Sequence, residues 1–95
     1  MKVYIAGKIT GDKNYKAKFA EAAEFYRSNG CIVLNPATLP EGREPKDYMR
    51  ICFAMIDVAD VVVFLPDYIN SDGAGLEYYY CCYTKKSIHY HGKNK

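Results

Sequence analysis

An apolar run, Val61-Val62-Val63-Phe64-Leu65-Pro66, constrains the fold of this chain more than any other segment. A run of this length without a charge, rich in valine, predicts a strand buried on both faces, as in parallel sheets covered by helices. Beyond it, Ser71 to Glu77 form a glycine-bearing turn, and Tyr78 to Lys86 can continue as a helix. We therefore expect a strand–turn–helix unit whose turn lies at the carboxyl end of a parallel strand. Open α/β sheets bind their ligands at that edge.

Strand-length apolar runs and helix-length segments alternate along the rest of the chain. Further strands are predicted over Val3 to Ala6, Cys31 to Leu34 and Ser87 to Tyr90. Helices are predicted from Asp12 or Asn14 to about Ser28 and from Pro45 to about Ala59. The apolar residues that we expect the first helix to turn inward are Ala17, Ala20, Ala22 and Phe25. Thr38 to Glu44, with a proline and a glycine, is predicted to be a loop over the site.

This alternation predicts an α/β fold. Right-handed crossovers make it a flavodoxin-like three-layer sandwich with a 4-5-stranded parallel sheet in the order 2-1-3-4(-5). We expect one domain over residues 1–90 and a polar C-terminal tail over residues 91–95. The strand order places the loops after the first and third strands side by side. Gly7 to Gly11 should therefore lie next to Ser71 to Glu77, so that two glycine-bearing loops share one crevice.

Composition argues against several classes of partner. The net charge is +2, with basic and acidic residues interspersed, which is too small and too mixed to favour nucleic acid or a membrane surface. The apolar runs are strand-sized, and Met1-Lys2-Val3-Tyr4 begins a strand rather than a signal peptide. The four cysteines show no C-x-x-C spacing. We interpret them as reduced thiols of a cytoplasmic protein, and we expect neither a metal nor a cofactor.

The glycine-bearing turn is predicted to carry Glu77 into the first turn of the last helix. Glycines let backbone approach a ligand closely, and the free N–H groups of a helix start favour an anion. The helix dipole helps to keep Glu77 ionised, whereas burial would raise its pKa. Two interpretations fit these residues about equally well: a ligand site with a reactive carboxylate, or an ordinary turn with Glu at a favourable position.

Five motifs in order resemble a known family. They are Met1-Lys2-Val3-Tyr4-Ile5-Ala6-Gly7, Asn35-Pro36, Tyr48-Met49-Arg50, Asp57-Val58-Ala59-Asp60 and Ser71-x-Gly73-Ala74-x-Leu76-Glu77. Together they resemble the nucleoside 2-deoxyribosyltransferase superfamily over Met1 to about Tyr90. The likeness is greatest to a compact bacterial and phage branch known only as a domain of unknown function. The resemblance implies a flavodoxin-like fold and cleavage of the N-glycosidic bond between a base and a (deoxy)ribose.

The resemblance also implies roles for residues. Glu77 stands where the superfamily has its catalytic Glu, and Tyr4 stands where it has a first-strand Tyr that could orient the carboxylate. A carboxylate beside C1′ can stabilise an oxocarbenium ion or attack it to form a glycosyl ester, which water or a second base then resolves. The remaining candidate site residues, expected around the phosphate, sugar and base, are Gly7, Lys8, Ile9, Asn35, Cys52, Ser71, Gly73 and Gly75. Ser71, six residues before Glu77, corresponds to a serine that binds the 5′-phosphate in the nucleotide hydrolases of the superfamily.

Two positions depart from the superfamily pattern. Cys52 stands where an Asp is usual, eight residues before Asp60, and Lys8 replaces the usual Pro after the first-strand glycine. With these departures, the resemblance still implies a nucleoside or nucleotide N-glycosidase or 2-deoxyribosyltransferase. The alternatives are a non-catalytic module that binds or sequesters a nucleotide, which Cys52 favours, and a hydrolase of NAD-like dinucleotides.

The last helix contains an unusual aromatic cluster, Tyr78-Tyr79-Tyr80-Cys81-Cys82-Tyr83, in a chain with ten tyrosines. A helix aromatic on all sides cannot be buried in so small a monomer. The superfamily often completes its sites with a neighbouring subunit. We therefore expect a homodimer or larger homo-oligomer with Tyr79, Tyr80 or Tyr83 at the interface. His89 and His91 are predicted to be surface residues rather than metal ligands.

Overall fold

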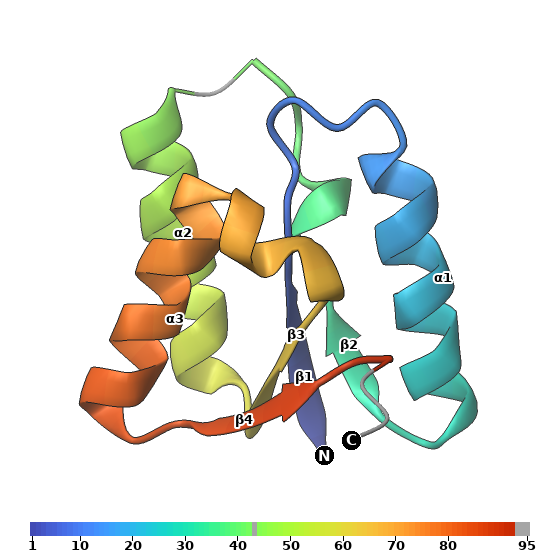
Figure 1. Ribbon diagram of the computed structural model, residues 1–95. Coiled ribbons are helices and arrows are strands. Elements are labelled where there is room, and N and C mark those ends of the chain that lie inside the picture. The colour runs from blue at the N-terminus through green and yellow to red at the C-terminus, as the bar shows by residue number, and fades with distance from the viewer. Residues whose placement is uncertain (43, 93–95) are drawn as a thin grey trace.

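A computed structural model describes residues 1–42 and 44–92 of the protein. Its sheet contains β1 (Lys2–Ala6), β2 (Ile32–Leu34), β3 (Val61–Phe64) and β4 (Ser87–Tyr90), all parallel, in the order β2-β1-β3-β4 (Figure 1). The predicted strand order is therefore confirmed, with the first strand in the interior of the sheet. Among the residues described, the sheet has four strands and no fifth.

Three helices cover the sheet in two layers. Figure 1 shows α1 (Tyr15–Ser28) on one side of it, and α2 (Pro45–Val58) and α3 (Asp72–Thr84) together on the other. Alternate residues of β1 supply the two cores, because successive side chains of a strand point to opposite faces. Tyr4 packs in the cluster under α2 and α3, and Ile5 packs with the buried residues of α1. The flavodoxin-like α/β sandwich predicted from the sequence is thus the observed fold.

The buried face of α1 differs from the predicted one. Its buried residues are Phe19, Ala22, Ala23 and Tyr26, which follow the i, i+3, i+4, i+7 spacing of a helical stripe. Ala17 and Ala20 are exposed, and Phe25 keeps 52% of its surface exposed. The prediction that these three face the sheet was wrong, because the stripe includes a tyrosine and turns Phe25 away from the sheet.

The second strand is shorter and more exposed than predicted. β2 forms one edge of the sheet, begins at Ile32 and leaves that residue 62% exposed. Pro36–Thr38 then form a 3₁₀ turn. An apolar run at a sheet edge is covered on fewer sides, which the run alone does not reveal.

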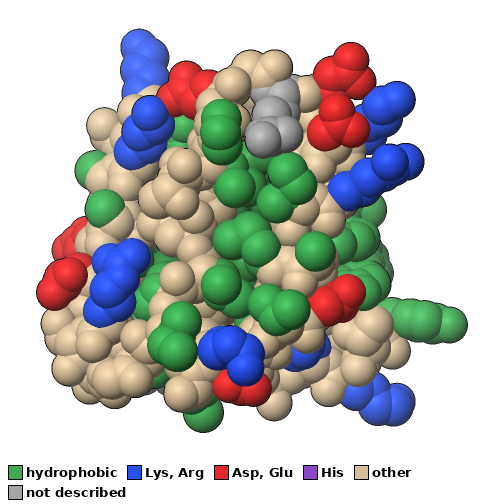
Figure 2. All heavy atoms as spheres, turned by 180° about the vertical axis from the view of Figure 1, so that it is seen from behind, with side chains coloured by type: hydrophobic (Ala, Val, Ile, Leu, Met, Phe, Trp, Pro, Cys, Tyr) green, Lys and Arg blue, Asp and Glu red, His purple; other side chains and the backbone are tan. Residues whose placement is uncertain are grey.

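Seen from behind, the molecule shows a central band of hydrophobic side chains with charged side chains around it (Figure 2).

His91, the residue after β4, is held to β3 and α1 by hydrogen bonds. The His91 backbone N–H donates to the Phe64 carbonyl oxygen at 2.9 Å, and its ring lies 2.9 Å from the Tyr26 hydroxyl. Residues 93–95 of the predicted tail and residue 43 of the predicted loop lie outside the described residues. Within the described residues, no helix is both long enough and apolar enough to cross a membrane.

Candidate functional site

A pocket opens where β1 and β3 end side by side. From this point the chain leaves β1 towards α1 on one face and leaves β3 towards α3 on the other, which is the topological switch point of the sheet. The pocket has a volume of about 720 Å³, in the range of small-molecule sites. The loop after β1, the start of α2 and the first turns of α3 supply its walls.

Seven of the ten residues predicted for the site line this pocket. They are Tyr4, Gly7, Lys8, Ile9, Ser71, Gly73 and Glu77. Asn35, Cys52 and Gly75 do not line it. Asn35 instead borders an adjoining cleft of about 530 Å³, and its side chain accepts a hydrogen bond from the Ala37 N–H at 3.0 Å. Its visible role is to cap the turn after β2.

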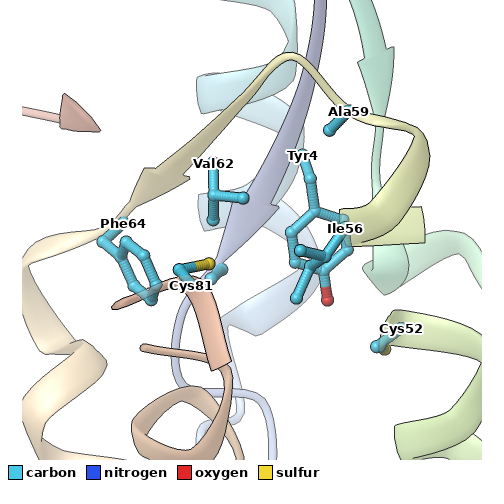
Figure 3. Close-up of a cluster of buried hydrophobic side chains, with 8 residues drawn as sticks. Tyr4, Cys52, Ile56, Ala59, Val62, Phe64 and Cys81 are labelled. Atoms are coloured by element: carbon cyan, nitrogen blue, oxygen red, sulfur yellow. The ribbon is translucent and has the colours of Figure 1, made fainter. Parts of the chain in front are cut away.

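Glu77 and Tyr4 form a buried pair at the inner end of the pocket. The Tyr4 hydroxyl donates to the Glu77 carboxylate at 2.8 Å, as expected from the sequence. Tyr4 is 1% exposed and Glu77 is 6% exposed. Figure 3 shows the Tyr4 ring extending from its strand, with the hydroxyl towards the side where Cys52 lies. The strand therefore fixes the donor, and the helix fixes the acceptor.

Burial controls the ionisation of this pair. It raises the pKa of Glu77 from 4.5 to about 7, although the hydrogen bonds from Tyr4 and Cys52 act in the opposite direction. Desolvation, together with the neighbouring Glu77 charge, raises the pKa of Tyr4 well above its ordinary range, so the hydroxyl remains a donor. Near neutral pH the Glu77 carboxyl is present in both of its forms. That state suits a group with an acid–base or nucleophilic task.

Cys52 lies behind the pair, although it does not line the pocket. It is 1% exposed and close enough to Tyr4 and Glu77 to affect the pKa of each. Burial raises the pKa of its own thiol to about 12. The thiol is therefore protonated at neutral pH and cannot act as a base. Asp57, the next acid along α2, is exposed and accepts a hydrogen bond from Tyr80 at 2.6 Å.

The start of α3 differs from the predicted turn. The helix begins at Asp72, and Ser71 is its N-cap, with the side chain accepting a hydrogen bond from the Ala74 N–H at 3.1 Å. Glu77 is consequently in the second turn rather than the first, which weakens the influence of the helix dipole on it. Gly75 lies within the helix, away from the pocket, and a Cβ atom built there would meet nothing within 4 Å. The predicted ligand contact of Gly75 is thus not supported by its position.

The loop after β1 lies directly against the segment after β3. A Cβ atom on Gly7 would come within 2.9 Å of Leu65 Cδ1 and 3.2 Å of Asp67 Oδ1. Glycine at this position therefore allows the two strand ends to approach each other, rather than allowing a positive φ angle. The next residue, Lys8, extends across the junction and donates from Nζ to the Asn70 carbonyl oxygen at 2.9 Å.

Two residues that line the pocket, and two that contact the loop beside it, were not predicted from the sequence. Tyr15 and Tyr48 line it, and the Tyr48 hydroxyl donates to the Pro36 carbonyl oxygen at 2.8 Å. Tyr48 belongs to one of the motifs that carry the family resemblance, so the sequence did contain a signal that could have placed it at the site. Asp67 follows the end of β3, where the carboxyl-end rule places site residues. Lys18, which donates to the Lys8 carbonyl oxygen at 3.0 Å, gave no such signal, because this contact depends on the tertiary fold.

The fold and the pocket together define a flavodoxin-like α/β protein with a buried acid at its switch point. In the described part of the chain, no cluster of His, Cys, Asp and Glu side chains could hold a metal ion. The chain belongs to the family described as "Domain of unknown function (DUF4406)", which matches residues 1–90. No curated protein matches the chain.

Proposed function

We propose that the protein cleaves the N-glycosidic bond of a nucleoside or nucleoside 5′-monophosphate, with Glu77 as the nucleophile. The observation that carries this proposal is the Tyr4–Glu77 hydrogen bond of 2.8 Å, buried at the inner end of the switch-point pocket. The motifs that resemble the nucleoside 2-deoxyribosyltransferase superfamily support the same chemistry. Burying a carboxylate at a pocket costs desolvation free energy, which favours a functional role for Glu77 over a structural one.

In the proposed reaction the bond between C1′ and the base nitrogen breaks, and its electron pair leaves with the base. The Glu77 carboxylate stabilises the positive charge that develops on the sugar and closes on C1′ to form an ester. Water then attacks C1′, the Glu77 carboxylate leaves, and the proton that the water loses balances the one that the departed base takes up. In a transfer, a second base attacks C1′ instead, displaces Glu77 and loses the proton of its attacking nitrogen. Tyr4 is the proposed orienting group, because its rigid ring holds the hydroxyl against the carboxylate throughout.

The ionisation of Glu77 sets the expected pH dependence. A nucleophilic carboxylate must be ionised, and burial raises the pKa of Glu77 to about 7. Activity should therefore rise with pH and level off above about 7. The phosphate of a nucleotide would lie at the outer end of the pocket, near Lys8, Ser71 and the backbone of Gly73.

A second candidate function is a non-catalytic module that binds or sequesters a nucleotide. The protonated Cys52 thiol favours it, because it cannot supply the acid–base help of the Asp usual at this position. An NAD-like dinucleotide is a further candidate substrate, since the same carboxylate chemistry applies to any N-riboside. A reducing, cytoplasmic setting forms part of the proposal, and the four free thiols are consistent with it.

The test is incubation with a panel of nucleosides, 5′-monophosphates and NAD, with released base measured by chromatography. Release of base from one substrate class supports the glycosidase. Binding of a nucleotide without release of base, at any pH from 5 to 9, would overturn the glycosidase and favour the binding module.

A further inference from the structure

A closed ring of polar contacts surrounds the backbone of Lys8. The Lys8 N–H donates to Asp67 Oδ1 at 3.1 Å, and the Lys8 carbonyl oxygen accepts from Lys18 Nζ at 3.0 Å. Lys18 and Asp67 close the ring as a salt bridge. The two peptide groups of Lys8 are therefore held from both sides by one ion pair, whose members come from α1 and from the segment after β3.

This arrangement uses the full donor capacity of Lys18. An ammonium group has three donors, and those of Lys18 go to the Lys8 carbonyl oxygen, the Asp67 carboxylate and the Asp12 carboxylate. Its side chain is only 26% exposed. Burial alone would lower the pKa of Lys18, but the hydrogen bonds to Asp12 and Asp67 raise it overall, so the ion pair persists at neutral pH.

The ammonium group of Lys8 itself is differently placed. Among the described residues it forms no salt bridge, and its hydrogen bond goes to a neutral acceptor, the carbonyl oxygen of Asn70. Asp67 and Asp12 lie close by and share the single charge of Lys18, so the two carboxylates and the two lysines are neutral together. Lys8 is therefore the cation of this group that lines the pocket, and its ammonium group is held beside Asn70, the residue before Ser71.

We infer that Lys18 and Asp67 are positioning residues, which fix the backbone of Lys8 so that its ammonium group receives a phosphate-bearing ligand. This inference rests on the proposed function for the nature of the ligand, and it narrows the substrate class to the nucleoside 5′-monophosphate. Neither residue would touch the substrate. Each acts through Lys8.

The test uses ribose 5-phosphate and ribose as probes, because neither contains a glycosidic bond to a base. Their binding to the full chain is followed by NMR titration at fixed ionic strength, so the result does not depend on catalysis. We expect the parent to bind ribose 5-phosphate more tightly than ribose. Lys8→Met and Lys18→Met should each weaken ribose 5-phosphate binding about tenfold and leave ribose binding unchanged.

Non-additivity distinguishes positioning from direct attraction. Because Lys18 acts through Lys8, the double variant should bind ribose 5-phosphate no more weakly than Lys8→Met alone. Lys18→Arg, which keeps the charge and several donors, should retain most of the affinity. Arg27→Met at the far end of α1 removes the same charge away from the pocket and should bind like the parent. Asp67→Asn, nearly identical in shape, should bind ribose 5-phosphate several-fold more weakly than the parent. This variant tests the positioning role if Lys18→Met does not fold.

Additive losses from Lys8→Met and Lys18→Met would overturn the positioning role, and so would parental affinity in Lys18→Met or Asp67→Asn. A parent that does not discriminate ribose 5-phosphate from ribose would overturn the phosphate site itself. If the expected pattern appears while no nucleotide releases base, the glycosidase fails and the phosphate site stands. If the protein releases base from nucleosides and a 5′-phosphate changes neither binding nor release, the phosphate site fails and the glycosidase stands.

Discussion

Replacing Glu77 by Gln should change how the stability of the protein depends on pH. Glu77 is the buried carboxyl of the described residues, and its pKa in the folded protein is about 7 against an ordinary value of 4.5. Below pH 4.5 the acid is protonated in both folded and unfolded chains, so its burial costs little. Between the two values the unfolded chain ionises first, which favours unfolding as the pH rises. Above about 7 the penalty is constant.

The size of the penalty follows from the two pKa values. Their separation corresponds to about 3 kcal/mol of unfolding free energy, at roughly 1.4 kcal/mol for each pH unit. Glutamine has the same shape and no charge, so Glu77→Gln escapes this penalty. The stability of Glu77→Gln relative to the parent should therefore increase by about 3 kcal/mol from pH 4.5 to pH 8. Any loss of hydrogen bonding to Tyr4 is independent of pH and cancels in this comparison.

Urea denaturation of both proteins between pH 4 and pH 8 measures the effect. The gap between their midpoints should widen by roughly 1–3 M urea, given the usual dependence of stability on urea for small domains. Glu21→Gln, on the exposed face of α1, removes a carboxylate that carries no burial penalty and serves as the matched control. Parallel pH profiles for Glu77→Gln and the parent would refute the idea that Glu77 is buried at an energetic cost.

Three further predictions concern the pocket and the surface. Tyr4→Phe removes the hydroxyl that stabilises the ionised Glu77 carboxylate. The pH at which activity rises should therefore increase by about one to two units. An unchanged pH–rate profile would count against the pairing. Gly7→Ala, whose Cβ would lie 2.9 Å from a leucine side chain, should destabilise the protein by about 1–3 kcal/mol. Gly75→Ala, in open space within a helix, should stabilise the protein by up to about 1 kcal/mol. Equal thermal unfolding temperatures for the two variants would contradict the packing argument. We propose that a second copy of the chain covers the rings of Tyr79 and Tyr83, which are 76% and 89% exposed and lie four residues apart on α3. Light scattering should therefore show a dimer or a larger oligomer, and the double variant Tyr79→Lys, Tyr83→Lys should be a monomer. A parent that is monomeric at every micromolar concentration would exclude this interface.

The tyrosines of α3 do not all have the same surroundings. Tyr80 is stacked on Phe53 of the same chain, with ring centroids 4.4 Å apart. Tyr78 contacts Tyr68 and Phe64, and its hydroxyl lies 3.0 Å from that of Tyr90. The helix therefore buries part of its aromatic surface within the monomer. The sequence could not distinguish these rings, because their partners lie on other elements.

The order of elements was predictable because each strand and helix carried a local signal. The valine run of β3, the glycine after β1 and the proline at the start of α2 each indicate one element boundary, and the resulting alternation admits few topologies. Exposure was less predictable. Whether Ile32 is buried depends on the position of its strand in the sheet, and a three-residue edge strand has no local mark of that position.

At the site, the Tyr4–Glu77 pair was expected from the family resemblance together with the strand order, whereas its surroundings were not. The strand order alone placed the two residues at the same end of the sheet, and the resemblance suggested that they interact. The helix start was misjudged because two glycines within a few residues favour a loop, whereas here the Ser71 side chain caps the helix at Asp72. The Lys18–Asp67 contact joins residues 49 positions apart, and no local pattern encodes it.

The most direct test of the proposed function compares base release by the parent and by Glu77→Gln with the nucleotide that the substrate panel identifies. The variant retains the shape of the pocket and loses only the charge that acts on C1′. We expect it to bind the nucleotide with similar affinity and to release base at least about 100-fold more slowly, in keeping with the loss of one electrostatic group in the transition state. Release of base by Glu77→Gln at the parental rate would contradict the account, because the reaction would then proceed without the buried carboxylate.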